Sequence, residues 1–270
     1  MSYSVPSVVS IAGSDSSGGA GIQADIKTIQ AMGLYAQTVV TALTAQNTMG
    51  VAGVAGTDPA FVRLQIDAVF EDIRPDAVKI GMVSSPEIVD AIADGLAAHD
   101  ARNVVVDPVM VATSGARLID EGAQGRLEER LFELATVITP NIPEAQVLCG
   151  MDISTRSDME RAARILAQRT NGAVLVKGGH GSLDAADVLF ADGEMHWFVT
   201  ERIDTPNTHG TGCTLSSAIA CGLAQGASAV DAVAAAKRYI AGAIGASFSM
   251  GKGSGPLDHM WAYRNHPIAE

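Results

Sequence analysis

Five short segments of the chain carry carboxylate, amide, ammonium or thiol side chains, which are the groups that bind and move charged ligands, and four of the five also contain glycines. They are GSDSSGGAG (13–21), DPVMVATSG (107–115), NIPE (141–144), KGGHG (177–181) and THGTGC (208–213). The first four follow short apolar runs that predict β-strands, and the fifth opens a helical pattern. Because ligands of open α/β sheets bind beyond the carboxyl ends of the strands, these segments predict one shared site.

Gly210, Thr211, Gly212 and Cys213 form a run of small residues directly before an apolar helical pattern. Small residues let successive backbone N–H groups point at one place, and a helix N-terminus carries partial positive charge. The run therefore predicts an anion site, which in phosphoryl transfer would stabilise charge on the transferred group. An ordinary glycine-rich helix start is the alternative.

Two carboxylates, Asp107 and Glu144, each follow an expected strand. Oxygen ligands of this kind hold Mg²⁺ against nucleotide phosphates. Asn141 and Glu144 also have the spacing of a helix capping box, and both functions are compatible. Lys177 closes an apolar strand before two glycines, so its ammonium can reach a bound phosphate. A surface lysine is the alternative for that residue.

Cys213 begins an expected helix, a position that favours the thiolate and makes the sulfur a better nucleophile or base. A small core residue is its alternative, and it is the role we expect for Cys149 and Cys221. Three cysteines without Cys-x-x-Cys spacing do not make a disulfide framework and suit a reducing cytoplasm. The six histidines show no zinc-binding spacing.

Other nucleotide and nucleophile motifs are absent from the sequence. The segment from Gly245 to Gly251-Lys252 has five intervening residues and continues with Gly253, whereas a Walker A loop needs four and then Ser or Thr. No G-x-S-x-G nucleophile elbow occurs. The first glycine-rich loop lacks the G-x-G-x-x-G order of a dinucleotide site.

Short β-branched runs alternate with longer amphipathic stretches, which predicts an α/β fold with a mostly parallel sheet covered on both faces. Asp192-Gly193 is a hairpin dipeptide and predicts an antiparallel edge formed by residues 187–199. No linker or repeat divides the 270 residues, so we expect one domain, 1–270. The expected strands are 8–12, 35–40, 77–81, 103–107, 137–139 and 173–177, and the expected helices are 22–32, 84–98, 120–133, 143–149, 158–169, 214–225 and 229–248.

The chain is acidic, with 18 Lys and Arg against 30 Asp and Glu and a net charge of −12. This balance argues against nucleic-acid and anionic-membrane partners, while a local basic pocket for a phosphorylated small molecule stays possible. Mean hydropathy is high at +0.21, yet no apolar run approaches the roughly 20 residues of a membrane span. The sequence MSYSVPS at the start has no secretory-signal pattern. We therefore expect a cytoplasmic location.

Taken together, the motifs resemble the hydroxymethylpyrimidine kinase family of the ribokinase-like superfamily. The match extends from about Val8 to His259 and comprises GSDSSGGAGIQADIKT, TALTAQNT, KIGM, DPVM, TPN-x-x-E, VKGGH and THGTGCT in that order. The resemblance implies a mostly parallel central sheet between helical layers, ATP and Mg²⁺ as cofactors, and a homodimer. It also implies phosphorylation of 4-amino-5-hydroxymethyl-2-methylpyrimidine (HMP) to the monophosphate and then to the diphosphate in thiamine biosynthesis.

The same resemblance assigns roles to residues that match the family's motifs. Gln46 and Asp25 would hydrogen-bond the aminopyrimidine, whose ring nitrogens accept and whose amino group donates. For Asp25, a solvated helix residue is the alternative. The remaining assignments are a pocket shaped by Gly13, Met82 and Val109, an anion hole formed by Gly210 to Cys213, Mg²⁺ held by Asp107 and Glu144, phosphates contacted by Asn141 and Lys177, and the transferable end of the nucleotide contacted by Thr211.

Two positions set this chain apart within that framework. Cys213 stands where many related sugar kinases have an aspartate base. A base helps to deprotonate the hydroxymethyl group, whereas the monophosphate is already an ionised nucleophile, so Cys213→Ala should impair the first step more than the second. Thr113 stands where relatives often have lysine, and Lys177 would then supply more of the positive charge.

Two alternative functions stay open at this point. A pyridoxal or pyridoxine kinase is the nearest, because an aldehyde substrate could react reversibly with Cys213. A non-catalytic vitamin sensor is the other. Such a sensor would have a damaged anion hole or metal site, but Asp107, Glu144 and Lys177 are all present.

Overall fold

One continuous sheet organises the part of the chain that this computed structural model describes, residues 5–110, 121–179 and 185–264. Its strand order is β3-β2-β1-β4-β5-β6-β7-β8-β9. Neighbouring strands from β2 to β7 are parallel, whereas β3, β8 and β9 pair in antiparallel fashion. The strands are β1 (Ser7–Asp15), β2 (Tyr35–Asn47), β3 (Gly50–Gly56), β4 (Ala77–Ile80), β5 (Val104–Val106), β6 (Val137–Ile138), β7 (Ala173–Val176), β8 (Ala186–Ala191) and β9 (Glu194–Val199).

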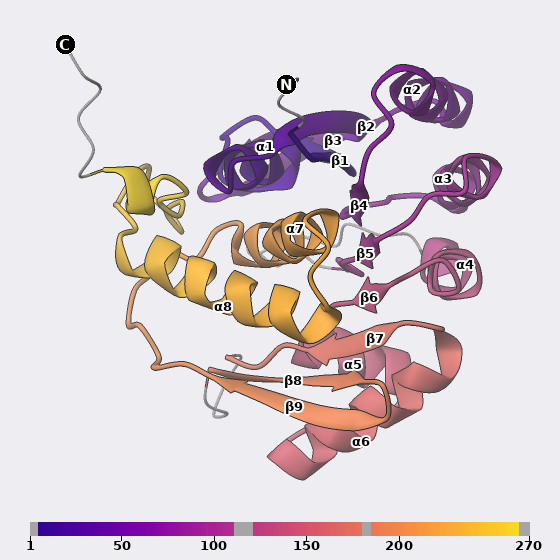
Figure 1. Cartoon of the computed structure of the whole chain (residues 1–270). Helices are drawn as coiled ribbons and strands as arrows, with labels where there is room; N and C mark the ends of the chain where they lie inside the picture. Colours follow the sequence, from indigo (N-terminus) through magenta and orange to yellow (C-terminus); the bar gives the residue numbers. More distant parts are fainter. Residues whose placement is uncertain (1–4, 111–120, 180–184, 265–270) are drawn as a thin grey trace.

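Helices cover both faces of this sheet (Figure 1). One layer contains α2 (Pro59–Asp72), α3 (Pro86–Ala98), α4 (Glu121–Leu131), α5 (Ile142–Cys149) and α6 (Arg156–Leu166). The opposite layer contains α1 (Gly21–Ala31), α7 (Thr211–Ala224) and α8 (Ala229–Gly245). Two short 3₁₀ helices occupy Ala167–Arg169 and Trp261–Tyr263.

The central strands are apolar on both sides because each face is covered by helices. In β5, Val104 and Val106 join the core cluster on one face, while Val105 joins the cluster on the other. All three valines are at most 1% exposed, and full burial of such a side chain contributes about 1.5–3 kcal/mol. The predicted α/β class, with its mostly parallel sheet and antiparallel edge, is confirmed.

The first edge of the sheet was not predicted. β2 extends to Asn47, well beyond the expected end at Val40, and pairs with β3. β3 has the sequence GVAGVAG, and its Gly and Ala residues have low strand propensity. The helix α2 that follows was also missed, although Asp58 caps it by accepting from the N–H groups of Ala60 and Phe61. Within the described residues, no helix is long and apolar enough to cross a membrane.

Candidate active site

A buried ion pair lies at the carboxyl end of the sheet. Asp107 follows β5 and Lys177 follows β7, and Lys177 Nζ donates to Asp107 Oδ1 at 2.7 Å. Thr139, which follows the intervening strand β6, donates to the same oxygen at 3.1 Å. Burial alone would lower the pKa of Lys177, but Asp107 and Glu144 outweigh it and raise the pKa above its ordinary value. The surface-lysine alternative for Lys177 is therefore wrong.

The structure confirms one of the two roles expected for Glu144, the capping box, and places its carboxyl group near Asp107 and Lys177. Asn141 Oδ1 accepts from the Glu144 N–H at 2.9 Å, and Glu144 Oε2 accepts from the Asn141 N–H at 2.8 Å, so the predicted capping box is confirmed. Burial raises the pKa of Glu144 to about 7, with Lys177 lowering it and Asp107 raising it. The capping box thus places a second buried carboxyl group within the field of the Asp107–Lys177 pair.

The glycine-rich turn before α7 lies next to the Asp107–Lys177 ion pair. Gly210 is the N-cap of α7, with φ of 85°, and its Cα lies so close to the loop of residues 13–21 that an added Cβ would be 2.0 Å from the Gly19 carbonyl oxygen. A Cβ on Gly212 would lie 3.4 Å from Asp107 Oδ2 and 3.6 Å from Lys177 Nζ. The start of α7 therefore adjoins the ion pair, while Thr211 Oγ1 donates to the Thr208 carbonyl and closes the turn.

The sequence predicted that the helix N-terminus lowers the pKa of Cys213, and this prediction is wrong. Burial raises the pKa of this thiol above its ordinary value. Lys79 lowers the pKa, but the nearby carboxylates of Asp25 and Asp107 raise it further. The pKa of Cys213 is therefore raised and not lowered, despite its place at the helix N-terminus.

A second ion pair lies beneath this site and joins α1 to β4. Asp25 and Lys79 are both 0% exposed, with Lys79 Nζ 2.8 Å from Asp25 Oδ2. The hydroxyls of Ser10 and Ser217 also donate to the Asp25 carboxylate. The solvated-residue alternative for Asp25 is wrong, and with four hydrogen bonds its oxygens have little capacity left for a direct bond to a pyrimidine. Sequence analysis missed Lys79, although a lysine inside the apolar strand AVKI was a usable signal.

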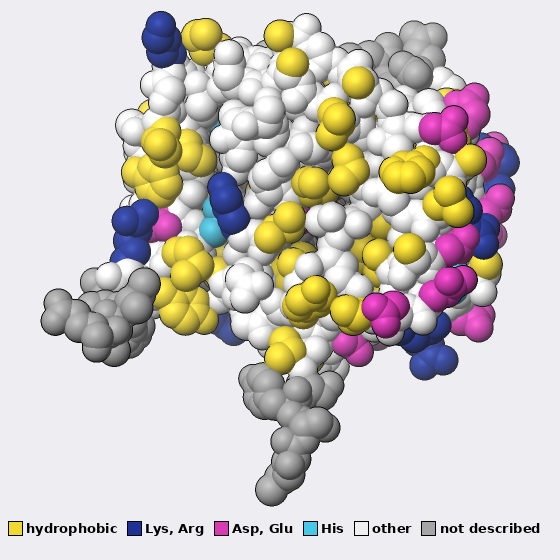
Figure 2. Space-filling view, turned by 90° about the horizontal axis from the view of Figure 1, so that it is seen from above, with side chains coloured by type: hydrophobic (Ala, Val, Ile, Leu, Met, Phe, Trp, Pro, Cys, Tyr) yellow, Lys and Arg dark blue, Asp and Glu magenta, His cyan; other side chains and the backbone are white. Residues whose placement is uncertain are grey.

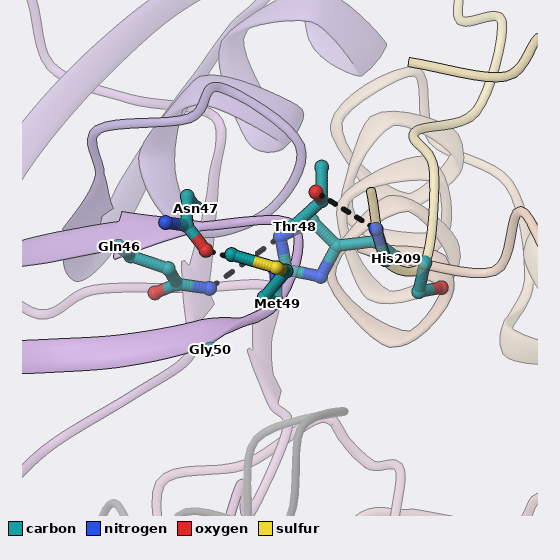
Figure 3. Close-up of a pocket in the computed structure, with 8 residues that line it drawn as sticks. Gln46, Asn47, Thr48, Met49, Gly50 and His209 are labelled. Carbon is teal, nitrogen blue, oxygen red and sulfur yellow. Dashed lines mark hydrogen bonds between the residues drawn. The ribbon is translucent and has the colours of Figure 1, made fainter. Parts of the chain in front are cut away.

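Gln46 lies at the end of β2 in a pocket of about 370 Å³, a volume that suits a small ligand. Figure 3 shows its carboxamide directed toward the His209 ring in the wall of this pocket, with Gln46 Nε2 3.4 Å from His209 Nε2. The other lining residues are Asn47, Thr48, Met49, Gly50, Gly253 and Ser254.

The three residues predicted to shape the pyrimidine pocket follow neighbouring strands or lie within them. Gly13 packs against Met82, since a Cβ on Gly13 would lie 3.0 Å from Met82 Sδ. Thr41 Oγ1 already donates to the Met82 carbonyl at 2.8 Å. Val109 is half-buried, and its N–H donates to the Asp107 carbonyl. Thr113 lies outside the described residues.

Two buried residues of the site were not assigned a role from sequence, although both occur in the glycine-rich segments. His209 Nε2 lies 2.8 Å from Asp15 Oδ2, and the two side chains are 8% and 3% exposed.

Among the described residues, no group of three or more His, Cys, Asp or Glu side chains could hold a metal ion. Asp107 and Glu144, the two carboxyl groups expected to hold Mg²⁺, therefore belong to no such group.

Comparison with known proteins decides the family. The model of the family described as phosphomethylpyrimidine kinase matches residues 15–258. The chain belongs to the phosphomethylpyrimidine kinase family. The predicted resemblance is thereby confirmed over most of the chain.

Members of the phosphomethylpyrimidine kinase family and their structural neighbours match this chain closely. The hydroxymethylpyrimidine/phosphomethylpyrimidine kinase of Streptomyces coelicolor is 48% identical over 257 residues, covering 95% of both chains. The thiamine biosynthesis bifunctional protein of Geobacter sulfurreducens is 54% identical over 257 residues, but this chain spans only 52% of its length. The ADP complex of Bacillus subtilis pyridoxal kinase has a TM-score of 0.90 at 38% identity, covering 97% of this chain and 100% of that one.

Proposed function

We propose that the chain transfers the terminal phosphoryl group of ATP to HMP and then to HMP monophosphate. The observation that carries the proposal is the meeting of the Asp107–Lys177 pair with the N-terminus of α7 at the carboxyl end of the sheet. The name of the Streptomyces relative covers both kinase steps, and a structural neighbour holds ADP. A vitamin sensor that does not turn over would not need this buried charge pair.

The chain's own groups supply the electrostatic part of phosphoryl transfer. Backbone N–H groups from Gly210 to Cys213 and the Lys177 ammonium stabilise the negative charge that develops on the transferred group. Gly212 leaves room for a phosphate between the helix start and Lys177, because it has no side chain. Asn141 and Thr211 contact the nucleotide phosphates at the rim of the same site. With Thr113 in place of lysine, Lys177 provides more of the positive charge.

Asp107 and Glu144 hold Mg²⁺ in this proposal. Mg²⁺ keeps several waters and is held by one or two carboxylates together with substrate phosphates, so a pair of carboxyl groups fits it without a third protein ligand. When bound, the ion neutralises charge on the nucleotide phosphates. The raised pKa of Glu144 is caused first by burial, and the nearby Asp107 carboxylate adds to it.

The Mg²⁺ requirement is expected to depend on pH through Glu144. Its pKa of about 7 means that the carboxyl group is mostly protonated at pH 6 and mostly ionised at pH 8. Because Mg²⁺ binds the ionised form, the Mg²⁺ concentration for half-maximal rate should be about tenfold higher at pH 6 than at pH 8. The measurement is a Mg²⁺ titration of the rate at both pH values. Glu144→Gln, which keeps a capping side chain, should lose this pH dependence, and an unchanged dependence would refute the assignment.

Cys213 serves the first step as a base that is mostly protonated in the resting enzyme. Because burial raises the pKa of this thiol, the first-step rate should keep rising as the pH is raised above neutrality. Cys213→Ala should lower kcat about 10²-fold with HMP and far less with HMP monophosphate. Pre-steady-state rates for each substrate test this, with Cys149→Ala as the half-buried cysteine control. Equal losses in both steps would contradict the role.

Gln46 holds the aminopyrimidine, with Gly13, Met82 and Val109 shaping its pocket and Asp25 supporting it from below. Pyridoxal is the second candidate substrate, because the Bacillus subtilis neighbour is a pyridoxal kinase. Measuring kcat/KM for HMP and for pyridoxal, in the wild type and in Gln46→Ala, separates the two functions. A higher value for pyridoxal in the wild type would move the assignment to pyridoxal kinase.

A homodimer would cover the exposed apolar edge of the sheet. Leu43 of β2, Val54 of β3, and Phe61 and Leu64 of α2 are 50–61% exposed. Figure 2 looks onto this end of the molecule and shows hydrophobic side chains across the face, with acidic groups mostly toward one rim. Leu43→Glu should therefore convert the dimer to a monomer in sedimentation. Val147→Glu, at a similarly exposed position on α5, should leave the dimer intact; a monomeric wild type would refute the proposal.

The setting proposed for this enzyme is a reducing compartment such as the cytoplasm. The three cysteines are all free thiols, which suits such a compartment.

One sheet extends through the described residues from β3 to β9, which supports a single domain over 1–270.

A further inference from the structure

Residues 251–259, which follow α8, connect two parts of the site that lie far apart in the sequence. At one end they contact the turn between β2 and β3, which lines the pocket that contains Gln46. At the other end they contact the turn that precedes α7 and the first turn of that helix. These nine residues are called the C-terminal segment below.

Thr48 holds the C-terminal segment at the pocket. Its Oγ1 accepts from the backbone N–H groups of Lys252 at 3.1 Å and of Gly253 at 3.2 Å (Figure 3). The two backbones also touch, because an added Cβ on Gly253 would lie 2.0 Å from the Thr48 carbonyl oxygen. The β2–β3 turn and the C-terminal segment therefore form one joined wall of the pocket.

The next residues of the C-terminal segment hold the turn that precedes α7. Ser254 Oγ accepts from the Thr208 N–H at 3.3 Å, and the Gly255 carbonyl accepts from the His209 N–H at 3.1 Å. His209 also forms an isolated parallel bridge with Pro256. These contacts fix the backbone that leads directly into the anion hole.

His259 contacts the start of α7 itself. Its Nε2 lies 3.0 Å from Oγ1 of Thr214, which directly follows Cys213. The two residues are 5% and 0% exposed. Burial lowers the pKa of His259 to about 4, so the ring is neutral at pH 7. Tyr239 of α8 donates its hydroxyl hydrogen to the His259 carbonyl at 2.8 Å, which fixes this end of the C-terminal segment.

We propose that Thr48 and His259 are positioning residues, through which the C-terminal segment keeps the acceptor in the pocket aligned with the anion hole. The inference rests on the proposed kinase function. Alignment matters because a misplacement of about 1 Å between reacting groups can cost about 10²-fold in rate. The Asp15–His209 pair already joins the first glycine-rich loop to the same turn, so the C-terminal segment supplies a second connection, from the β2–β3 turn.

Thr48→Val tests the end of the C-terminal segment at the pocket. Valine has the shape of threonine but no hydroxyl, so the N–H groups of Lys252 and Gly253 lose their shared acceptor. Gln46 keeps its own support, because Ser16 Oγ accepts from its backbone N–H and donates to its carbonyl. We therefore expect kcat for HMP to fall about tenfold with KM nearly unchanged. Thr48→Ser, which keeps the hydroxyl, should restore kcat.

His259→Leu tests the end of the C-terminal segment at α7. Leucine fills the buried space but cannot hydrogen-bond Thr214, so kcat should again fall about tenfold. His259→Gln, whose amide can reach the position of Nε2, should restore most of the rate. Because both steps use the same anion hole, the loss should be equal for HMP and HMP monophosphate. This pattern differs from that of Cys213→Ala, which is selective for the first step.

Two residues at the opposite edge of the sheet provide matched controls. Thr136, half-buried like Thr48, accepts from the Val104 N–H at 3.1 Å through its hydroxyl oxygen. His99 is the C-cap of α3. Thr136→Val and His99→Leu should leave kcat unchanged. Melting temperatures identify any variant that fails to fold, and the half-buried Thr48 position tests the proposal even if His259→Leu does so.

The double variant Thr48→Val/His259→Leu decides whether both residues act through the C-terminal segment. If they do, its loss in kcat should be smaller than the product of the two single losses. A wild type that does not phosphorylate HMP would refute the proposed function and the inference with it. In a wild type that does, an unchanged kcat in Thr48→Val, no recovery in Thr48→Ser, or a double loss equal to the product would refute the inference alone.

Discussion

Replacing Gly210 by alanine is expected to lower kcat by about 10²–10³-fold, the loss that follows removal of one donor from an anion hole. The added Cβ would lie 2.0 Å from the Gly19 carbonyl oxygen, which is a backbone atom and cannot move aside alone. The turn and the loop of residues 13–21 must therefore separate. That movement displaces the N–H groups at the start of α7 from the phosphoryl group that they stabilise.

Gly226 provides the matched control for this substitution. It has almost the same left-handed backbone, with φ of 84°, but apart from its chain neighbours no atom of the described residues lies within 4 Å of the position of an added Cβ. Gly226→Ala therefore carries the backbone cost, about 1–2 kcal/mol, without the clash. Steady-state kinetics and thermal melts of both variants make the test. Equal kcat values for the two would show that the close contact of Gly210 with Gly19 has no catalytic importance.

Lys177→Met is expected to lower kcat by about 10³-fold, because a cation that stabilises charge on the transferred phosphoryl group contributes at least that much. The substitution also leaves Asp107, which is 1% exposed, without its partner. Removing one partner of a buried pair costs about 3–5 kcal/mol of folding free energy. Single-turnover rates and denaturant unfolding measure the two effects separately.

Two further variants separate catalysis from folding at Lys177. Adding Asp107→Asn to Lys177→Met removes the unpaired charge, so stability should recover in part while kcat stays low. Lys237→Met breaks another buried pair, in which Lys237 Nζ lies 2.9 Å from Asp187 Oδ2. It should lower stability to a similar extent and kcat far less. If Lys237→Met and Lys177→Met reduced kcat equally, the loss at Lys177 would be attributable to folding alone.

Sequence was sufficient for features that depend on neighbouring residues or on general rules of sheet topology. The capping box of Asn141 and Glu144 is local, and it forms as expected. Asp107 and Lys177 meet because each directly follows a parallel strand and such strands end at one edge of the sheet.

Features that depend on contacts between distant segments could not be predicted from local sequence patterns. The helix N-terminus predicted a thiolate at Cys213, but partial burial and the carboxylates of Asp25 in α1 and of Asp107 after β5 raise the pKa of the thiol. His209 and Asp15 are 194 residues apart in the chain, so nothing in either local pattern indicated their pairing. β3 was missed because its glycines and alanines are weak strand formers that pair only when β2 extends beside them.

The measurement that tests the central claim most directly is ATP turnover by the purified protein with Mg²⁺. HMP, HMP monophosphate and pyridoxal are offered separately, the products are identified by mass spectrometry, and Lys177→Met serves as the inactive control. We predict monophosphate and then diphosphate from HMP, and diphosphate from the monophosphate. Pyridoxal phosphate as the dominant product, or tight HMP binding without any phosphorylated product, would contradict the account.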